Sequence, residues 1–180
     1  SFHSVNTKYN VLYNGDIALD EGKEELNNNY RDNYWDILPI ERLEVTDEIR
    51  LDSEGNNPKF TIAEEKATKA IQKHSMDIKY RERNPEIDGA FLLVGKSRYF
   101  DQRYIPALEA FNYILKNNTD SDMLIEATIW REKVNIRLEN EELAIKNLKR
   151  LLKNAYLKDQ EYADARAMMA QAYINLKAPD

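Results

Sequence analysis

The feature that most constrains the fold is a two-helix pattern between Asp88 and Ser121. Large and small apolar residues recur there at helical spacing, first at Phe91, Val94, Gly95 and Tyr99 and then, after a short polar link, at Tyr104, Ala107, Phe111 and Ile114. Residues three and four apart share one face of an α-helix. The stretch therefore predicts a helical hairpin of the tetratricopeptide kind, which needs neighbouring hairpins to bury its apolar face.

Copies of this pattern are found on both sides of the hairpin. Phe60, Ala63, Ala67 and Ala70 repeat the 3, 4, 3 spacing, which predicts a helix over 57–76 that pairs with a first helix over 8–28. A degenerate copy follows, with Glu132 in place of Gly95. A further first helix begins near Gln160. The spacing from Ala107 to Ala144 is 37 residues and that from Glu132 to Ala170 is 38, against the usual 34, so we expect longer helices.

The fold class predicted from these copies is all-α, a tetratricopeptide-like right-handed solenoid of helical hairpins with an irregular aromatic insertion in the first hairpin. Local signals agree, because Asn57-Pro58 and Asn84-Pro85 are typical helix starts. Gly15 and Gly22 lie seven apart and would permit close helix approach. The expected segments are a flexible lead-in 1–7, an atypical first hairpin 8–83 with the insertion 30–56, a tetratricopeptide repeat 84–121, a degenerate repeat 122–158, and the first helix of a further, truncated repeat 159–180.

Composition and motifs exclude several classes of function. The net charge is −6, no cysteine is present, and residues 1–60 hold 13 Asp and Glu against 6 Lys and Arg, so the chain lacks the basic surface that nucleic-acid binding needs. No phosphate-binding loop, zinc motif or nucleophile elbow is present, and Asp52, Glu54 and Asn56 lack the remaining spacing of a calcium loop. We therefore expect a non-catalytic chain without a cofactor or metal. An enzyme whose catalytic part lies beyond residue 180 is the weakest alternative.

Two groups of residues are candidates for binding. The aromatic insertion either covers the end of the solenoid or docks a protein partner, because Tyr and Trp are frequent in interface hot spots. Its candidates are Tyr30, Tyr34, Trp35, Ile37 and Leu38. The second group is expected on the concave face of the solenoid and comprises Leu92, Lys96, Tyr99, Ile129, Lys133 and Ile136. Such residues more often serve packing and solubility than a peptide groove.

The chain resembles the N-terminal region of the SprE/PorW family, tetratricopeptide lipoproteins of gliding motility and type IX secretion in Bacteroidetes. The resemblance is carried by FHSVNTKYNVLYNGDIALDEGKEEL, NYWDILPIERLEV, NPKFTIAEEKATKAIQKHSM and IDGAFLLVGKSRYFDQRYIPALEAFNYIL. It implies a scaffold on the periplasmic side of the outer membrane, anchored by a lipidated cysteine upstream of Ser1, that links the secretion translocon to a periplasmic motor ring. The alternative is a periplasmic repeat domain that binds a peptide or peptidoglycan fragment.

Overall fold

The computed structural model describes residues 2–31, 41, 55–77 and 85–177. These residues contain α-helices and no strand, which confirms the predicted all-α class for this part of the chain. The helices are α1 (Phe2–Asn29), α2 (Pro58–Asp77), α3 (Pro85–Phe100), α4 (Tyr104–Asn117), α5 (Ser121–Arg137), α6 (Glu141–Asn154) and α7 (Asp159–Asn175).

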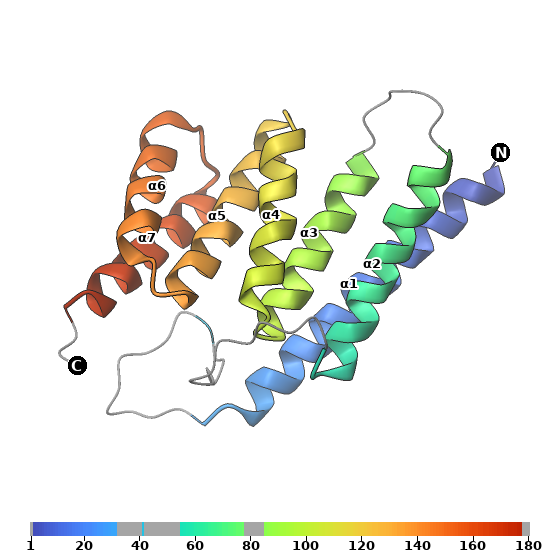
Figure 1. Ribbon diagram of the computed structural model, residues 1–180, viewed down its shortest axis with the longest axis horizontal. Coiled ribbons are helices and arrows are strands. Elements are labelled where there is room, and N and C mark those ends of the chain that lie inside the picture. Colours follow the sequence, from blue (N-terminus) through green and yellow to red (C-terminus); the bar gives the residue numbers. More distant parts are fainter. Residues whose placement is uncertain (1, 32–40, 42–54, 78–84, 178–180) are drawn as a thin grey trace.

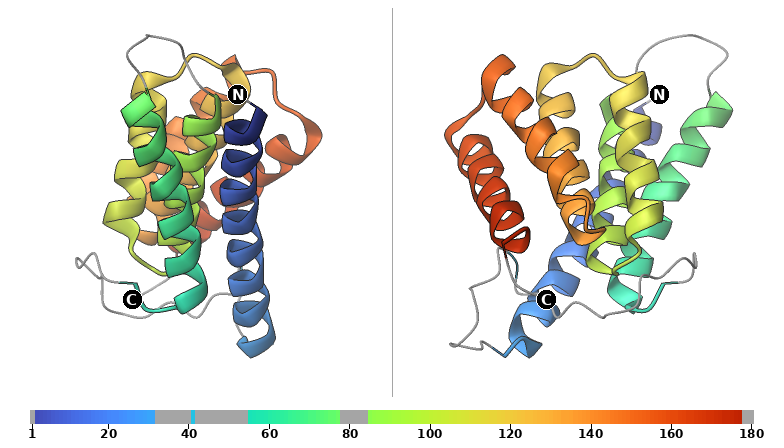
Figure 2. Two further views of the ribbon diagram at one scale, coloured as in Figure 1. Left: turned by 90° about the vertical axis from the view of Figure 1, so that its right-hand side faces the viewer. Right: turned by 60° about the vertical axis from the view of Figure 1, so that its left-hand side comes forward.

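The helices stand in a row in the order of the chain, with the two termini toward opposite ends of the row (Figure 1). Each helix packs against the next one along the chain. The odd-numbered helices α1, α3, α5 and α7 also contact one another in succession, whereas α2, α4 and α6 make no such contacts among the described residues. Figure 2 shows this row from two further directions. The odd-numbered helices therefore form one continuous layer, and the even-numbered ones cover its other side.

Two apolar clusters form the core. The larger one extends from α1 to α5 and is centred on aromatic side chains, including Phe60, Tyr99, Phe100 and Phe111. The smaller one joins the last three helices through Ile125, Ile129, Leu148, Ala165 and Met168. Each helix buries its apolar face against its neighbours, as the 3, 4 spacing of the sequence requires.

Small residues set the distance between paired helices. A Cβ atom built on Gly95 would lie 2.4 Å from Cε1 of Phe111, and one built on Gly22 would lie 2.5 Å from Cε1 of Phe60. Only glycine leaves room for these rings at such a distance, since a real Cβ would overlap them. The close approach predicted at Gly15 and Gly22 is confirmed, since a Cβ built on Gly15 would lie 2.7 Å from Cδ2 of Leu93, and Gly95 allows the same between α3 and α4.

The turns after α3 and α5 have the same construction. Gln102 and Glu139, separated by 37 residues, both have φ of 60° in the left-handed region. The amide of Arg103 donates to the carbonyl of Arg98 at 2.8 Å, and the amide of Asn140 donates to the carbonyl of Asn135 at 2.8 Å. A left-handed residue of this kind ends a helix by satisfying its last carbonyls. The two helix pairs are thus joined by equivalent turns.

The structure differs from the sequence-based expectation at the N-terminus. The first helix was expected from residue 8, after a flexible lead-in over 1–7, but α1 begins at Phe2. No glycine or proline precedes Gly15, so nothing in the sequence breaks the helix before that point. Most of the insertion, residues 32–40 and 42–54, lies outside the described residues, and its irregular conformation stays a prediction.

Candidate functional site

The strongest candidate site lies where α3 and α5 meet. Trp130, Lys133 and Arg137 are spaced three and four residues apart and therefore lie on one face of α5. Tyr99 comes from the last turn of α3, and α3 and α5 end at the same side of the molecule (Figure 1). The two helices thus bring one indole, one phenol and two cations together.

Aromatic rings hold this arrangement in place. Tyr99 packs edge to face against Trp130, with ring centroids 5.4 Å apart, and makes similar contacts with Phe100 and Tyr104. The Nζ atom of Lys133 lies 4.2 Å from the centroid of the Trp130 ring, within range of a cation–π interaction. Arg137 lies over the ring of Tyr99 at 5.9 Å. Both cations are therefore positioned by rings of the core.

A carboxylate from the insertion enters this arrangement. Glu41 Oε1 accepts a hydrogen bond from Lys133 Nζ at 2.8 Å, and Oε2 accepts one from the hydroxyl of Tyr99 at 2.5 Å. Arg137 donates through Nε to the Tyr99 oxygen at 3.1 Å, and its Nη2 atom lies 3.5 Å from Glu41 Oε2. We call the five residues Glu41, Tyr99, Trp130, Lys133 and Arg137 the Glu41 cluster.

Electrostatics in the Glu41 cluster favour an ionised carboxylate beside a neutral phenol. Burial raises the pKa of Glu41, but the charge and hydrogen bond of Lys133, with those of Tyr99 and Arg137, outweigh it and lower the pKa. Burial and the nearby Glu41 charge raise the pKa of Tyr99 well above its usual value. Burial acts to lower the pKa of Arg137, yet its contacts with Tyr99, Tyr104 and Glu41 raise it. Each group therefore keeps its charge state near neutral pH.

The concave-face candidates separate into two sets. Lys96, Tyr99 and Lys133 gather around Trp130, with Lys96 Nζ 5.3 Å from the indole centroid and 2.7 Å from Glu126 Oε1. The remaining candidates pack into apolar clusters: Leu92 and Ile129 are buried, and Ile136 is half-buried against the smaller cluster. The polar members thus surround the indole, while the aliphatic members serve the core in this structure.

Of the five binding candidates in the insertion, Tyr30 is the one that the structure describes. Tyr30 is half-buried, and its amide donates to the carbonyl of Leu26 at 3.0 Å, which extends the end of α1. Tyr34, Trp35, Ile37 and Leu38 lie outside the described residues. The two predicted roles of the insertion, as a cover for the end of the molecule or as a docking element, stay predictions.

A second polar network secures the other end of the insertion. The Asp101 carboxylate accepts hydrogen bonds from the amides of Asn56 and Asn57, the latter at 2.9 Å, and from Arg103 Nε at 2.8 Å. Glu64 of α2 in turn accepts from Arg103 and from Arg98. Asp101 and Arg103 are fully enclosed, so this network joins the start of α2 to the turn between α3 and α4.

Three of the important polar residues were missed by sequence reasoning. Glu41 contacts residues 58 and 92 positions away, so no local spacing indicates its role. Arg137 was overlooked, although its place one turn after Lys133 on the same helical face could have indicated it. Glu132 was noted as a departure from the repeat, but not as a fully buried carboxylate that accepts from Arg131, Asn135 and Asn147.

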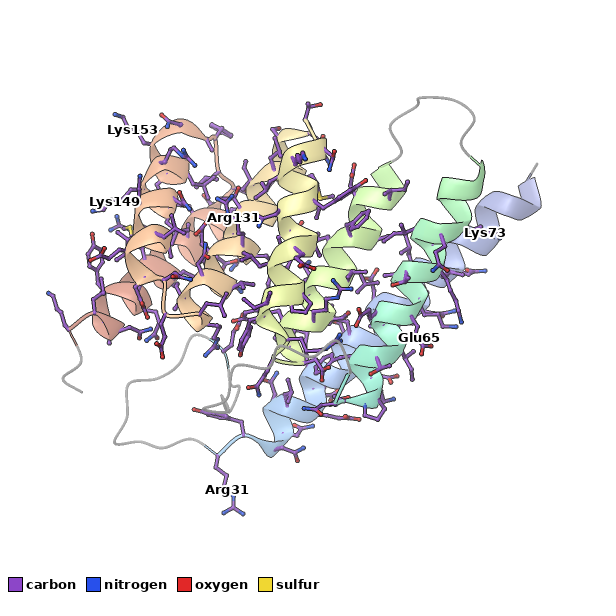
Figure 3. All side chains as sticks on the ribbon, in the orientation of Figure 1. Arg31, Glu65, Lys73, Arg131, Lys149 and Lys153 are labelled. Atoms are coloured by element: carbon purple, nitrogen blue, oxygen red, sulfur yellow. The ribbon has the colours of Figure 1, made fainter. Side chains whose placement is uncertain are left out.

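The surface outside the Glu41 cluster includes exposed charged side chains on α2 and α6. Glu65 and Lys73 on α2 and Lys149 and Lys153 on α6 are exposed, and Figure 3 shows their side chains projecting from the two helices. Among the described residues, no group of three His, Cys, Asp or Glu could hold a metal ion. The same residues include no helix long and apolar enough to span a membrane.

Comparison with known proteins adds no assignment. Neither protein-family models nor curated protein sequences match this chain.

Proposed function

We propose that this chain is a helical-repeat interaction module without catalytic activity. The observation that supports it best is the recurrence of one structural unit: equivalent turns at Gln102 and Glu139, and fully buried alanines at 90, 127 and 165. The alanines are spaced by 37 and 38 residues, as expected for successive hairpins of a tetratricopeptide-like solenoid with long helices. Solenoids of this kind expose extended surfaces that suit protein binding.

In its more specific form, the proposal is a scaffold or adaptor of type IX secretion. The resemblance to the SprE/PorW family implies an outer-membrane lipoprotein facing the periplasm that links the translocon to a periplasmic motor ring and supports gliding motility. The layer of odd-numbered helices, with a cation-rich cluster on α3 and α5, is consistent with a surface for protein partners.

The experiment is affinity isolation of the full-length protein from native membranes, followed by mass spectrometry of co-purified proteins. The wild type is compared with Tyr34→Ala plus Trp35→Ala, and with a matched double change of two exposed aromatic residues, Tyr156→Ala plus Tyr162→Ala. We expect secretion components with the wild type and their loss only with the first pair, if the insertion is the docking element. Absence of every secretion component from the wild-type sample would refute the adaptor proposal.

The alternative is a domain that binds a peptide or peptidoglycan fragment on the layer of odd-numbered helices. The observation in its favour is the Glu41 cluster, because two cations and two aromatic rings are suited to a carboxylate-bearing ligand. Calorimetry with muropeptides and with peptides would show saturable heat for this alternative. A loss of that heat in Lys133→Met, but not in the exposed control Lys153→Met, would assign the site.

A further inference from the structure

The Glu41 cluster consists of a receptor and a ligand that come from different parts of the chain. Tyr99, Trp130, Lys133 and Arg137 belong to α3 and α5, two helices that pack directly against each other. Glu41 belongs to the segment between α1 and α2, and within the described part of the chain its carboxylate accepts hydrogen bonds from Tyr99 of α3 and Lys133 of α5. We refer to the four residues of α3 and α5 as the receptor.

The receptor residues are also held by contacts that do not involve Glu41. Trp130 is held by Tyr99, Phe100 and Phe111, whose ring centroids lie 5.4 to 6.1 Å away. Lys133 is positioned by the indole of Trp130, and Arg137 by the ring and hydroxyl of Tyr99. A site that is rigid before its ligand arrives loses little entropy on binding.

The charge of the receptor selects an anion. Lys133 and Arg137 have side chains that are only 14% and 20% exposed, and Glu41 is the carboxylate paired with both among the described residues. Removal of that carboxylate would leave two largely desolvated cations without their counter-charge from the described part of the chain, which is unfavourable. The Tyr99 hydroxyl adds a neutral donor, so the receptor offers donors to both oxygens of a carboxylate.

The bound carboxylate also remains within reach of solvent. The side chain of Glu41 is 15% exposed, which distinguishes it from Asp101, whose side chain is 1% exposed in the second network. A carboxylate at a partly open edge can exchange with one from another molecule, whereas the enclosed Asp101 cannot do so without local unfolding.

We propose that the receptor is a binding site for an acidic side chain of a partner protein, and that Glu41 is its internal competitor. The proposal rests on the interaction function proposed above and names the chemistry of the partner. Glu41 is tethered to the receptor, so it competes at a high effective concentration and lowers the apparent affinity for the partner. Its loss should therefore strengthen binding in trans.

The test uses purified protein and a peptide of residues 36–46, DILPIERLEVT, labelled with fluorescein, in a fluorescence anisotropy titration. The matched peptide has glutamine in place of Glu41 only. We expect Glu41→Gln to bind the first peptide at least about tenfold more tightly than the wild type does. Adding Lys133→Met to Glu41→Gln should abolish the gain, whereas the exposed controls Glu65→Gln and Lys153→Met should behave as the wild type.

Several results would overturn the proposal. Equal affinity of both peptides for Glu41→Gln would show that the carboxylate is not recognised, and equal affinity of Glu41→Gln and wild type would show that Glu41 does not compete. If neither peptide bound to any variant, the receptor would not be a binding site for an acidic side chain. These outcomes concern the purified chain alone, so they are distinguishable from a failure to isolate secretion components from membranes.

A second measurement covers the case in which Glu41→Gln does not fold, as judged by circular dichroism. The wild type is titrated with the unlabelled peptides while the indole NH resonance of Trp130, assigned with Trp130→Phe, is followed by NMR. We expect a saturable shift with the glutamate peptide and none with the glutamine peptide. No shift with either peptide contradicts the proposal.

Discussion

At the scale of single residues, two glycines of the same helix have opposite roles. Gly95 faces the ring of Phe111, where an added Cβ would lie 2.4 Å from Cε1, whereas a Cβ on Gly89 meets nothing within 4 Å. Both glycines lie inside α3 and carry the same penalty in helix propensity. The space around each residue, rather than its type, therefore decides the effect of a substitution.

We expect Gly95→Ala to lower the free energy of unfolding by about 1–3 kcal/mol, because overpacking forces the ring of Phe111 or the helix to move. Gly89→Ala should instead raise it by about 0.5–1 kcal/mol through better helix propensity. Urea unfolding of the two variants and the wild type, followed by circular dichroism, measures both changes. A stabilising Gly95→Ala would show that the close approach of α3 and α4 does not depend on glycine.

At the scale of helices, local hydrogen bonds from polar residues define where several helices begin, and such residues can be recognised in the sequence. Asn57 Oδ1 accepts from the amide of Lys59 at 2.8 Å, and Asp120 Oδ1 accepts from the amide of Met123 at 3.0 Å. Asn140 occupies the same position before α6 but makes no capping bond with its side chain. Three polar residues at helix starts thus differ in what they contribute.

The pair Asp120→Ala and Asn140→Ala tests this difference. Asp120→Ala removes a hydrogen bond and a favourable charge at the start of α5, and should lower the free energy of unfolding by about 1 kcal/mol. Asn140→Ala removes no capping bond and should have a clearly smaller effect. Thermal and urea unfolding of both variants measure the difference. If both variants lost the same free energy of unfolding, the hydrogen bond from the Met123 amide to the Asp120 side chain would make no measurable contribution to stability.

At the scale of the whole molecule, the two polar networks tie distant parts of the chain together. The Glu41 cluster links the insertion to α3 and α5, and the Asp101 network links α2 to the turn after α3. In both networks, charged side chains that are partly or fully buried join segments that are far apart in sequence. The stability of the assembled molecule therefore depends on the charge state of these groups.

The pH dependence of unfolding should show the contribution of Glu41. Because its pKa is lower in the folded chain than the usual 4.5, its contribution is present above that value and is lost as the pH falls through the folded pKa. Glu41→Gln should lower the free energy of unfolding at pH 7 by about 1.5–3 kcal/mol, the usual range for hydrogen bonds to a charged group. Urea unfolding at pH 7 and pH 3 should show a smaller difference between the variant and wild type at pH 3. A difference that is independent of pH would show that the ionised carboxylate is not what stabilises the fold.

Much of the fold could be predicted because its signals are local. Helix starts at Asn57-Pro58 and Asn84-Pro85, the polar link before Tyr104 and the 3, 4 spacing of apolar residues all act within one or two turns. The close approach at Gly95 also followed, since a small residue opposite a large one is part of the hairpin pattern. The start of α1 at Phe2 was not predicted, because a terminal segment without breakers or strong apolar spacing carries little local information.

The candidate site was predictable in part for the same reason. Lys96, Tyr99 and Lys133 could be placed on one layer from helical periodicity, which the sequence by itself determines. Their carboxylate partner could not, because Glu41 is 92 residues from Lys133 and meets it only when α3 and α5 are packed side by side. The same holds for Asp101, whose bonds to the amides of Asn56 and Asn57 span 45 and 44 residues. Local spacing decided the helices and their pairing, and the tertiary structure alone decided which charges meet between them.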